Sequence, residues 1–127
     1  MSGVNRSVPN DALLGRFVDL PDLLARVEDD RDLLTELFVI FREELPGLHG
    51  ALHAAIDVGD LSRAAKAAHA LKGMLANMSM ERGATIVADV EMAARSGHIS
   101  ALKGTLASFD SEIAELSAAI CAFLEGT

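Results

Sequence analysis

The longest amphipathic stretch of the chain is residues 33–56, LLTELFVIFREELPGLHGALHAAI. Its large apolar residues recur at steps of three and four positions, which is the spacing of one face of an α-helix. The stripe consists of Leu33, Leu34, Leu37, Phe38, Phe41, Leu45, Leu48, Leu52 and Ile56. Pro46 lies inside the stripe, where a proline either kinks a helix or splits it in two. Because the stripe keeps its phase across Pro46, we expect one kinked, continuous helix from Arg31 to a stop at Gly59.

Helical signals continue on both sides of this stretch. The further helices that we expect cover residues 10–17, 19–27, 61–78, 80–96 and 99 or 100 to 124. Asp19 and Asp60 stand at N-cap positions, Pro21 lies in a first turn, and Ser79 can cap the helix over 80–96. No segment shows the alternating pattern of a strand. The pattern predicts an all-α fold, an antiparallel four-helix bundle with short additional N-terminal helices. We expect one domain over 10–127 behind a flexible tail over 1–9.

Composition excludes several classes of function. The net charge of −8 makes the surface repel phosphate backbones, so we expect no binding to nucleic acid. No apolar run reaches the length that spans a bilayer, and no signal peptide is evident, so we expect no membrane association. The single cysteine, Cys121, cannot form an internal disulfide and fits a reducing compartment. We therefore expect a cytoplasmic protein.

The helix over 61–78 contains one imidazole, His69, within AAHALKGM. On a helical wheel Ala64, Leu71, Leu75 and Met78 lie opposite His69 and form the side that faces the core. The residues around His69 are polar or small, so we expect its side chain to face water. Two cations, Lys66 and Lys72, stand three residues to either side. The residues expected to leave room for an approaching partner are Ala65, Gly73, Ala76 and, at the margin, Met74.

This pattern suits nucleophilic chemistry with phosphate. A neutral imidazole is a nucleophile near neutral pH, since its unperturbed pKa is about 6.5. Lys72 is expected to neutralise the charge of a phosphoryl group on His69, with Lys66 as an auxiliary cation. The sequence has no evident magnesium cage and no glycine-rich phosphate loop, so a partner would have to bring both metal and phosphate. Gly73 costs helix stability, which makes sense if a partner must approach closely.

The other candidate residues carry weaker signals. His49 and His53 share a helix face at the spacing of a metal pair, but Gly50 and Asp57 nearby suggest a solvated face and no further ligand is evident. We therefore expect no metal site. His98 follows Gly97 and is expected to cap a helix or lie on the surface. Cys121 lies beside an apolar stripe and is expected to be a buried structural thiol.

The motif AAHALKG resembles the signature of histidine-containing phosphotransfer (HPt) domains. The upstream helix, the Gly-Asp turn at Gly59–Asp60, Asn77 and the pair Val90-Glu91 with the following AARSG also resemble that family, over about residues 18–124. The resemblance implies a phosphorelay intermediate in two-component signalling. Four long helices that already cover one another fit a monomer. It implies that His69 accepts a phosphoryl group through Nε2 from a receiver-domain aspartate and passes it to another. The implied partners are response-regulator receiver domains and a hybrid histidine kinase, with Mg²⁺ supplied by the receiver.

Some features depart from this family, and two other functions remain open. The family often has a small residue where Met74 stands and a glycine where Ser79 stands. The phosphoacceptor domain of a histidine kinase has an acid directly after its histidine, whereas Ala70 follows His69, and we see no ATP-binding domain or room for one. We therefore expect no autokinase activity. The remaining alternative is a non-catalytic helical-bundle adaptor whose His69 is an inert surface residue.

Overall fold

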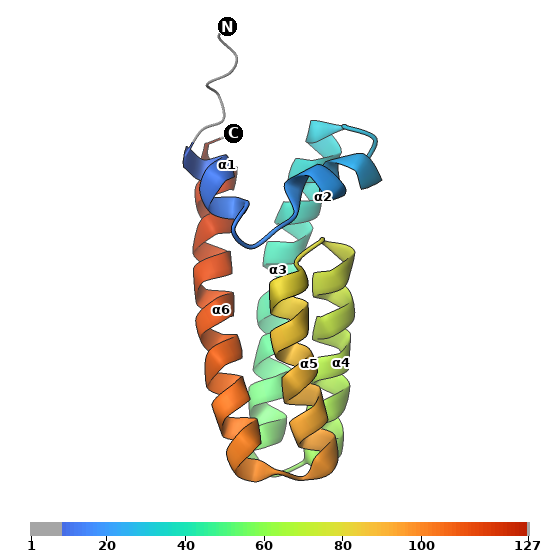
Figure 1. Ribbon diagram of the computed structural model, residues 1–127, viewed down its shortest axis with the longest axis vertical. Helices are drawn as coiled ribbons and strands as arrows, with labels where there is room; N and C mark the ends of the chain where they lie inside the picture. Colours follow the sequence, from blue (N-terminus) through green and yellow to red (C-terminus); the bar gives the residue numbers. More distant parts are fainter. Residues whose placement is uncertain (1–8, 127) are drawn as a thin grey trace, which may run out of the picture.

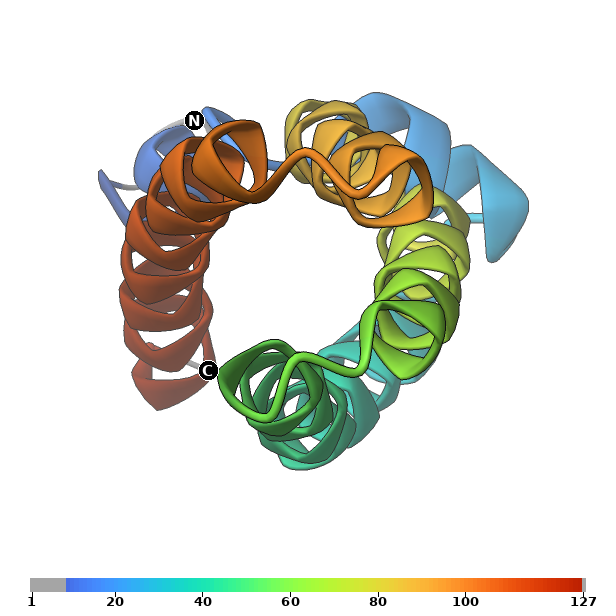
Figure 2. The same ribbon diagram turned by 90° about the horizontal axis from the view of Figure 1, so that it is seen from below.

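The computed structural model describes residues 9–126 as six α-helices joined by short turns. Their bounds are α1 Pro9–Leu14, α2 Leu20–Arg26, α3 Arg31–Asp57, α4 Leu61–Asn77, α5 Glu81–Ser96 and α6 Ile99–Glu125. The four long helices stand side by side, each running opposite to the one before it (Figure 1). Seen from the end they form a ring in the order α3, α4, α5, α6 (Figure 2), so the predicted all-α antiparallel bundle is confirmed.

Aspartate caps begin three of these helices. Asp19, Asp30 and Asp60 each accept a hydrogen bond from the backbone N–H three residues later, at 3.0–3.1 Å. Such a bond satisfies one of the backbone donors that a helix start leaves without an intrahelical partner. The predicted caps at Asp19 and Asp60 are confirmed, and Pro21 lies in the first turn of α2 as expected.

Helix α3 runs without interruption through Pro46, as the unbroken phase of its apolar stripe predicted. Most of that stripe is buried or half-buried in the bundle. Leu33 is the exception, because 40% of it is exposed at the start of α3, so its assignment to the core was wrong. The stripe begins one residue later, at Leu34, which is almost fully buried.

The core lies inside the four-helix bundle and is made largely of apolar side chains from all four long helices. Each of these helices contributes a stripe, as the periodic spacing predicted. The largest fully buried side chains in it include Phe38, Phe109, Leu52, Leu71, Leu75, Leu116 and Ile120. None of the helices described here is long and apolar enough to cross a membrane.

Three predicted boundaries need correction. The first helix includes Pro9, which was assigned to the tail, and ends at Leu14 rather than at Phe17. The rest of the predicted tail, residues 1–8, lies outside the described residues. Helix α5 begins at Glu81, and its N-cap residue is Met80, which makes no side-chain cap. Ser79 therefore does not cap α5 as proposed, because it stands one residue before the N-cap position. Its hydroxyl donates to Asp22 Oδ2 at 2.7 Å.

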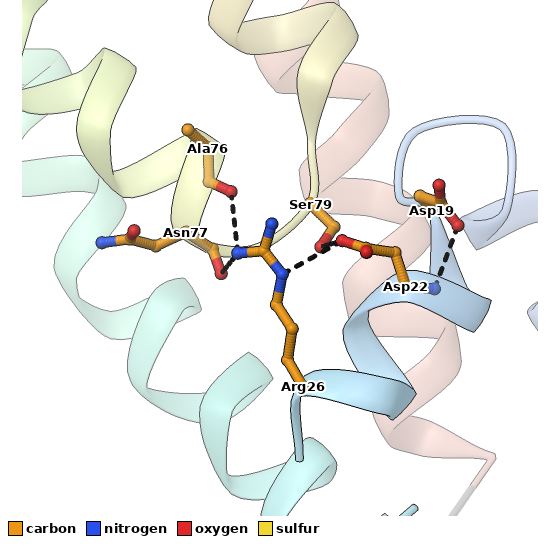
Figure 3. A network of polar contacts seen from close by, with 6 residues as sticks. All are labelled: Asp19, Asp22, Arg26, Ala76, Asn77 and Ser79. Carbon is orange, nitrogen blue, oxygen red and sulfur yellow. Dashed lines mark hydrogen bonds and ion pairs between the residues drawn. The ribbon is translucent and has the colours of Figure 1, made fainter. Parts of the chain in front are cut away.

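This bond belongs to a polar network that fastens α2 onto the turn between α4 and α5 (Figure 3). Arg26 donates to Asp22 at 3.0 Å and, at 3.4–3.5 Å, to the last carbonyl oxygens of α4 at Ala76 and Asn77. Ser79 has a φ of +56°, in the left-handed region that favours glycine. This backbone conformation explains why the HPt resemblance leads one to expect a glycine at residue 79. In this chain a serine occupies the position, and its hydroxyl bonds to Asp22.

We predict that Ser79→Gly is more stable than Ser79→Ala by about 1 kcal/mol. Both variants lose the bond to Asp22, and only glycine relieves the left-handed backbone. Chemical denaturation of the two variants measures the difference. Equal stabilities would show that the backbone at residue 79 relaxes when its side chain changes.

Candidate functional site

His69 lies near the middle of α4, and 64% of its side chain is exposed, as the wheel predicted. Its inner nitrogen, Nδ1, faces the carboxylate of Glu91 on α5, 3.2 Å from Oε2 and 3.4 Å from Oε1. These distances describe a long hydrogen bond. The outer nitrogen, Nε2, is the ring atom left for chemistry with a partner.

Glu91 is the buried centre of this site. Only 10% of its side chain is exposed, yet three other groups from two helices converge on it. Lys72 Nζ lies 2.9 Å from Oε1, and Arg95 donates from Nη2 and Nε to Oε2 at 2.8 and 3.0 Å. The hydrogen bond from Lys72 lowers the pKa of Glu91 most; burial opposes it, and bonds from Arg95 and His69 add to it, so the pKa falls to about 2.

The ionised Glu91 decides which nitrogen of His69 carries the proton. A carboxylate without a proton can only accept hydrogen bonds, so the ring nitrogen that faces it must be the donor. In the neutral imidazole Nδ1 therefore holds the proton and Nε2 keeps its lone pair. In its neutral form the ring therefore presents Nε2, with its lone pair, to the outside, and its tautomer is set by a residue on the neighbouring helix.

The charges around His69 leave an excess of one positive charge. Glu91 contributes one negative charge, and Lys72 and Arg95 contribute one positive charge each. Lys66, one turn before His69 on α4, is exposed and adds a further cation at the edge of the site. In a chain with a net charge of −8, this is a local positive region suited to an anion.

The predicted clearing around His69 is partly corrected. Ala65 is only 3% exposed, because the side of α4 on which it lies is covered by α5. Gly73 and Ala76 are exposed as expected, and Met74 is half-buried. From the positions of the buried residues, the centre of the exposed face lies about 40–50° round α4 from His69, toward Gly73. His69 is thus tilted toward α5, which brings it and Lys72 to Glu91.

Two shallow depressions flank the bridge between His69 and Glu91 along the seam of α4 and α5. One is lined by Ser62, Ala65, Lys66, Arg95 and neighbouring residues, and the other by Lys72, Ala76, Ala84, Ala88 and neighbouring residues. Small side chains and cations make up most of both linings, together with Leu61 in the first and Glu81 in the second.

The sequence analysis missed the roles of two residues here. Glu91 was noticed only as part of the Val90-Glu91 pair, and Arg95 only within AARSG. No spacing rule links either of them to His69, because Glu91 is 22 residues away on another helix. The i,i+4 relation between Glu91 and Arg95 was the one local signal that could have paired them.

The remaining candidates have different settings. His98 is the N-cap of α6 and accepts from the Ala101 N–H at 3.3 Å, which confirms its predicted capping role. Cys121 is a free thiol and half-buried rather than buried.

Gly50 and Asp57 suggested that His49 and His53 lie on a solvated face. This prediction was wrong, because both histidines are partly buried. Their Nε2 atoms lie 2.6 and 2.7 Å from the same oxygen of Asp110 on α6. Partial burial alone would raise the pKa of Asp110, but hydrogen bonds from His53 and His49 outweigh it and hold the pKa below its usual range.

Comparison with known proteins adds one finding. The family model described as Hpt domain matches residues 36–119, a span that contains His69, Lys72, Gly73 and Glu91. A search of curated proteins and a search of solved structures found no match.

We predict that Glu91 makes folding depend on acid pH. Because the pKa of Glu91 is lower in the folded chain than in the unfolded chain, its contribution is complete above about pH 4.5 and is lost as the pH falls toward 2. The partners of Glu91 are themselves 37–64% exposed, so screening by water reduces the effect to about 1–3 kcal/mol.

Denaturant unfolding between pH 2 and pH 6 measures this effect, with Glu91→Gln as the comparison. The variant keeps the shape of the side chain and loses the titrating group, so its stability should change less over that range. An equally steep acid loss in the variant would assign the pH dependence to other carboxylates.

Proposed function

The chain belongs to the Hpt domain family, and on that premise we propose that it is a phosphorelay intermediate that carries a phosphoryl group on His69. Hpt domains take part in histidine phosphotransfer. We propose specifically that His69 accepts the group from the aspartate of one receiver domain and passes it to the aspartate of another. The observation that carries the proposal is that Nδ1 of the exposed His69 faces the buried carboxylate of Glu91, which leaves Nε2 for a partner.

The proposed transfer forms one bond and breaks one. Nε2 of His69 attacks the phosphorus of an aspartyl phosphate, the N–P bond forms, and the bond from phosphorus to the aspartate oxygen breaks. The electron pair of that bond leaves with the aspartate, which becomes a carboxylate. No proton has to leave Nε2, because Nδ1 holds the only ring proton. The reverse sequence of bonds loads the next receiver.

Glu91 acts in this proposal as a positioning residue. When Nε2 forms its bond to phosphorus, the ring becomes positively charged while Nδ1 keeps its proton. The carboxylate next to Nδ1 favours that charge, as a buried aspartate does for the histidine of a serine protease triad. The nucleophile is thus oriented in the resting state and stabilised in the loaded state by the same carboxylate.

Lys72, Arg95 and Lys66 supply the proposed compensation for the phosphoryl charge. Lys72 is held by Glu91 at 2.9 Å, so its ammonium group stays beside His69 rather than moving freely in water. A phosphoryl group brings a charge of about −1.5 to −2 near neutral pH. It would meet the excess positive charge around Glu91, with Lys66 at the outer edge as the auxiliary cation.

We infer that the Mg²⁺ required for transfer belongs to the receiver. The buried carboxylate beside His69 is already engaged by Lys72 and Arg95, and two cations at one carboxylate make a poor setting for a divalent metal. Docking therefore has to bring the metal, the phosphate and most of the catalytic geometry. We propose that receivers dock over Gly73, Ala76 and the rim at Met74. Ala65, which α5 covers, lies outside that surface.

The competing function is a helical-bundle adaptor with an inert His69. An inert surface histidine needs no buried carboxylate behind it, whereas here two cations and His69 converge on one from two helices. This favours phosphotransfer over the adaptor. We further propose that the chain is a cytoplasmic monomer that receives its phosphate through a hybrid histidine kinase, and that it has no autokinase activity.

We predict that His69→Gln abolishes phosphotransfer. Wild-type chain mixed with a set of phosphorylated receiver domains should gain acid-labile, alkali-stable phosphate, and the variant should gain none, because glutamine lacks the nucleophilic nitrogen. His98→Asn is the matched control, since asparagine retains a good N-cap while removing a surface imidazole. Transfer that persists in His69→Gln would overturn the assignment. A wild-type chain that none of the receivers loads would favour the adaptor.

We predict that Gly73 separates docking from stability. A Cβ at residue 73 would meet no atom within 4 Å, so Gly73→Ala should stabilise the bundle by up to about 1 kcal/mol. Gly73→Leu should also fold well but slow transfer at least about tenfold by obstructing the receiver. Thermal unfolding and transfer rates measure the two effects. Transfer at the wild-type rate in Gly73→Leu would refute the clearance argument.

A further inference from the structure

A second polar cluster lies where α3 meets α6. His49 and His53 come from α3, and Asp110 comes from α6, 61 and 57 residues farther along the chain. Both Nε2 atoms point at the same carboxylate oxygen, Oδ1, at 2.6 and 2.7 Å. The side chains are 23%, 39% and 36% exposed, so the cluster is partly shielded from water and still open to it.

The fold holds these three groups in place from several sides. The two histidines are four residues apart and therefore lie next to each other on one face of α3. Their ring centroids lie 5.1 Å apart with the planes at 74°, and the ring of Phe109 packs edge-on against His49 at 5.6 Å. Phe109 is fully buried, so it anchors His49 to the core directly beside Asp110.

Phosphotransfer does not account for this cluster. His69 and Glu91 bridge α4 and α5, whereas His49, His53 and Asp110 bridge α3 and α6. In the ring of four helices these two seams lie on opposite sides (Figure 2). A receiver docked over His69 would leave the second cluster uncovered.

We propose that His49, His53 and Asp110 bind a divalent zinc ion. Two imidazole nitrogens and one carboxylate oxygen are the three-ligand set that proteins use to hold zinc with a water molecule in the fourth position. Two histidines four residues apart on one helix face are an established way of presenting the two nitrogens. Imidazoles disfavour Ca²⁺ and Mg²⁺, which prefer oxygen ligands throughout.

The three ligand atoms are close enough for one ion. They all lie within 4.8 Å of one another. Zinc bonds of about 2.0–2.2 Å in a tetrahedral arrangement place ligand atoms roughly 3.3 Å apart. The two hydrogen-bonded distances would therefore open by about 0.6 Å, which partly exposed side chains can achieve by small rotations. In the zinc-bound form Nε2 of each ring gives its lone pair to the metal and the ring proton moves to Nδ1.

Zinc at this position would join two helices that are far apart in the sequence. In the metal-free chain α3 and α6 share a polar contact of two histidines and one carboxylate, and the ion would replace those hydrogen bonds with coordinate bonds. Because the unfolded chain does not hold the three groups together, binding stabilises the folded state in proportion to the zinc present. The proposal is independent of phosphotransfer.

The test is zinc binding to the chain produced without a polyhistidine tag. Competition between the apo-protein and a chromophoric zinc chelator should show one zinc per chain, and zinc should raise the unfolding temperature until EDTA is added. His53→Ala and Asp110→Asn should each weaken binding at least about tenfold. Far-UV circular dichroism checks that both variants remain helical. Asp110→Asn keeps an acceptor for the histidines, so it separates loss of a ligand from loss of the hydrogen bonds.

Three control variants rule out the other imidazole and thiol ligands of the chain. His69→Gln, His98→Asn and Cys121→Ser should bind zinc as the wild type does. Loss of zinc in any of these controls, or equal affinity in wild type and Asp110→Asn, would overturn the proposal, as would a failure of the wild type to bind. The proposal would also be overturned if the chain bound one nickel or copper ion and did not bind zinc.

Discussion

The arrangement of side chains around His69 depends on one buried carboxylate. Glu91 sits between α4 and α5 with 10% of its side chain exposed, and it holds Lys72, Arg95 and His69 at once. An ionised carboxylate at such depth requires cations and hydrogen bonds, and here the groups that satisfy it are those that a phosphoryl group would meet. The need to pair this charge therefore links the packing of two helices to the tautomer of His69.

The same packing decides which face of α4 is turned toward the core and which is exposed. The stripe of Ala64, Leu71 and Leu75 turns into the core, and α5 covers the flank that carries Ala65. His69 is left at the edge of the exposed face, tilted toward Glu91, while Gly73 stands on the open side. His69 and Gly73 thus occupy different sectors of one helix: α5 orients the first, and the second lies on the exposed face.

Local rules predicted most of the fold because they act within one helix. Asp19 and Asp60 are caps as expected, α3 passes through Pro46, and the apolar stripes lie in the core. Two of the errors occurred where a contact between helices changed a local preference. Ser79 has a suitable side chain for a cap, but it stands one residue before the N-cap of α5, where its hydroxyl donates to Asp22 on α2. Ala65 has an exposed position on the wheel, but a neighbouring helix covers it.

The sequence by itself determined the helical bundle and the outward direction of His69, because periodic spacing and capping depend only on neighbours along the chain. The motif around His69 also indicated the family to which the chain belongs. Only the tertiary structure decided what stands behind the imidazole and which second cluster forms. Glu91 reaches His69, and Asp110 reaches His49 and His53, across 22 to 61 residues of chain. Such distances are closed by the packing of whole helices, which no local pattern encodes.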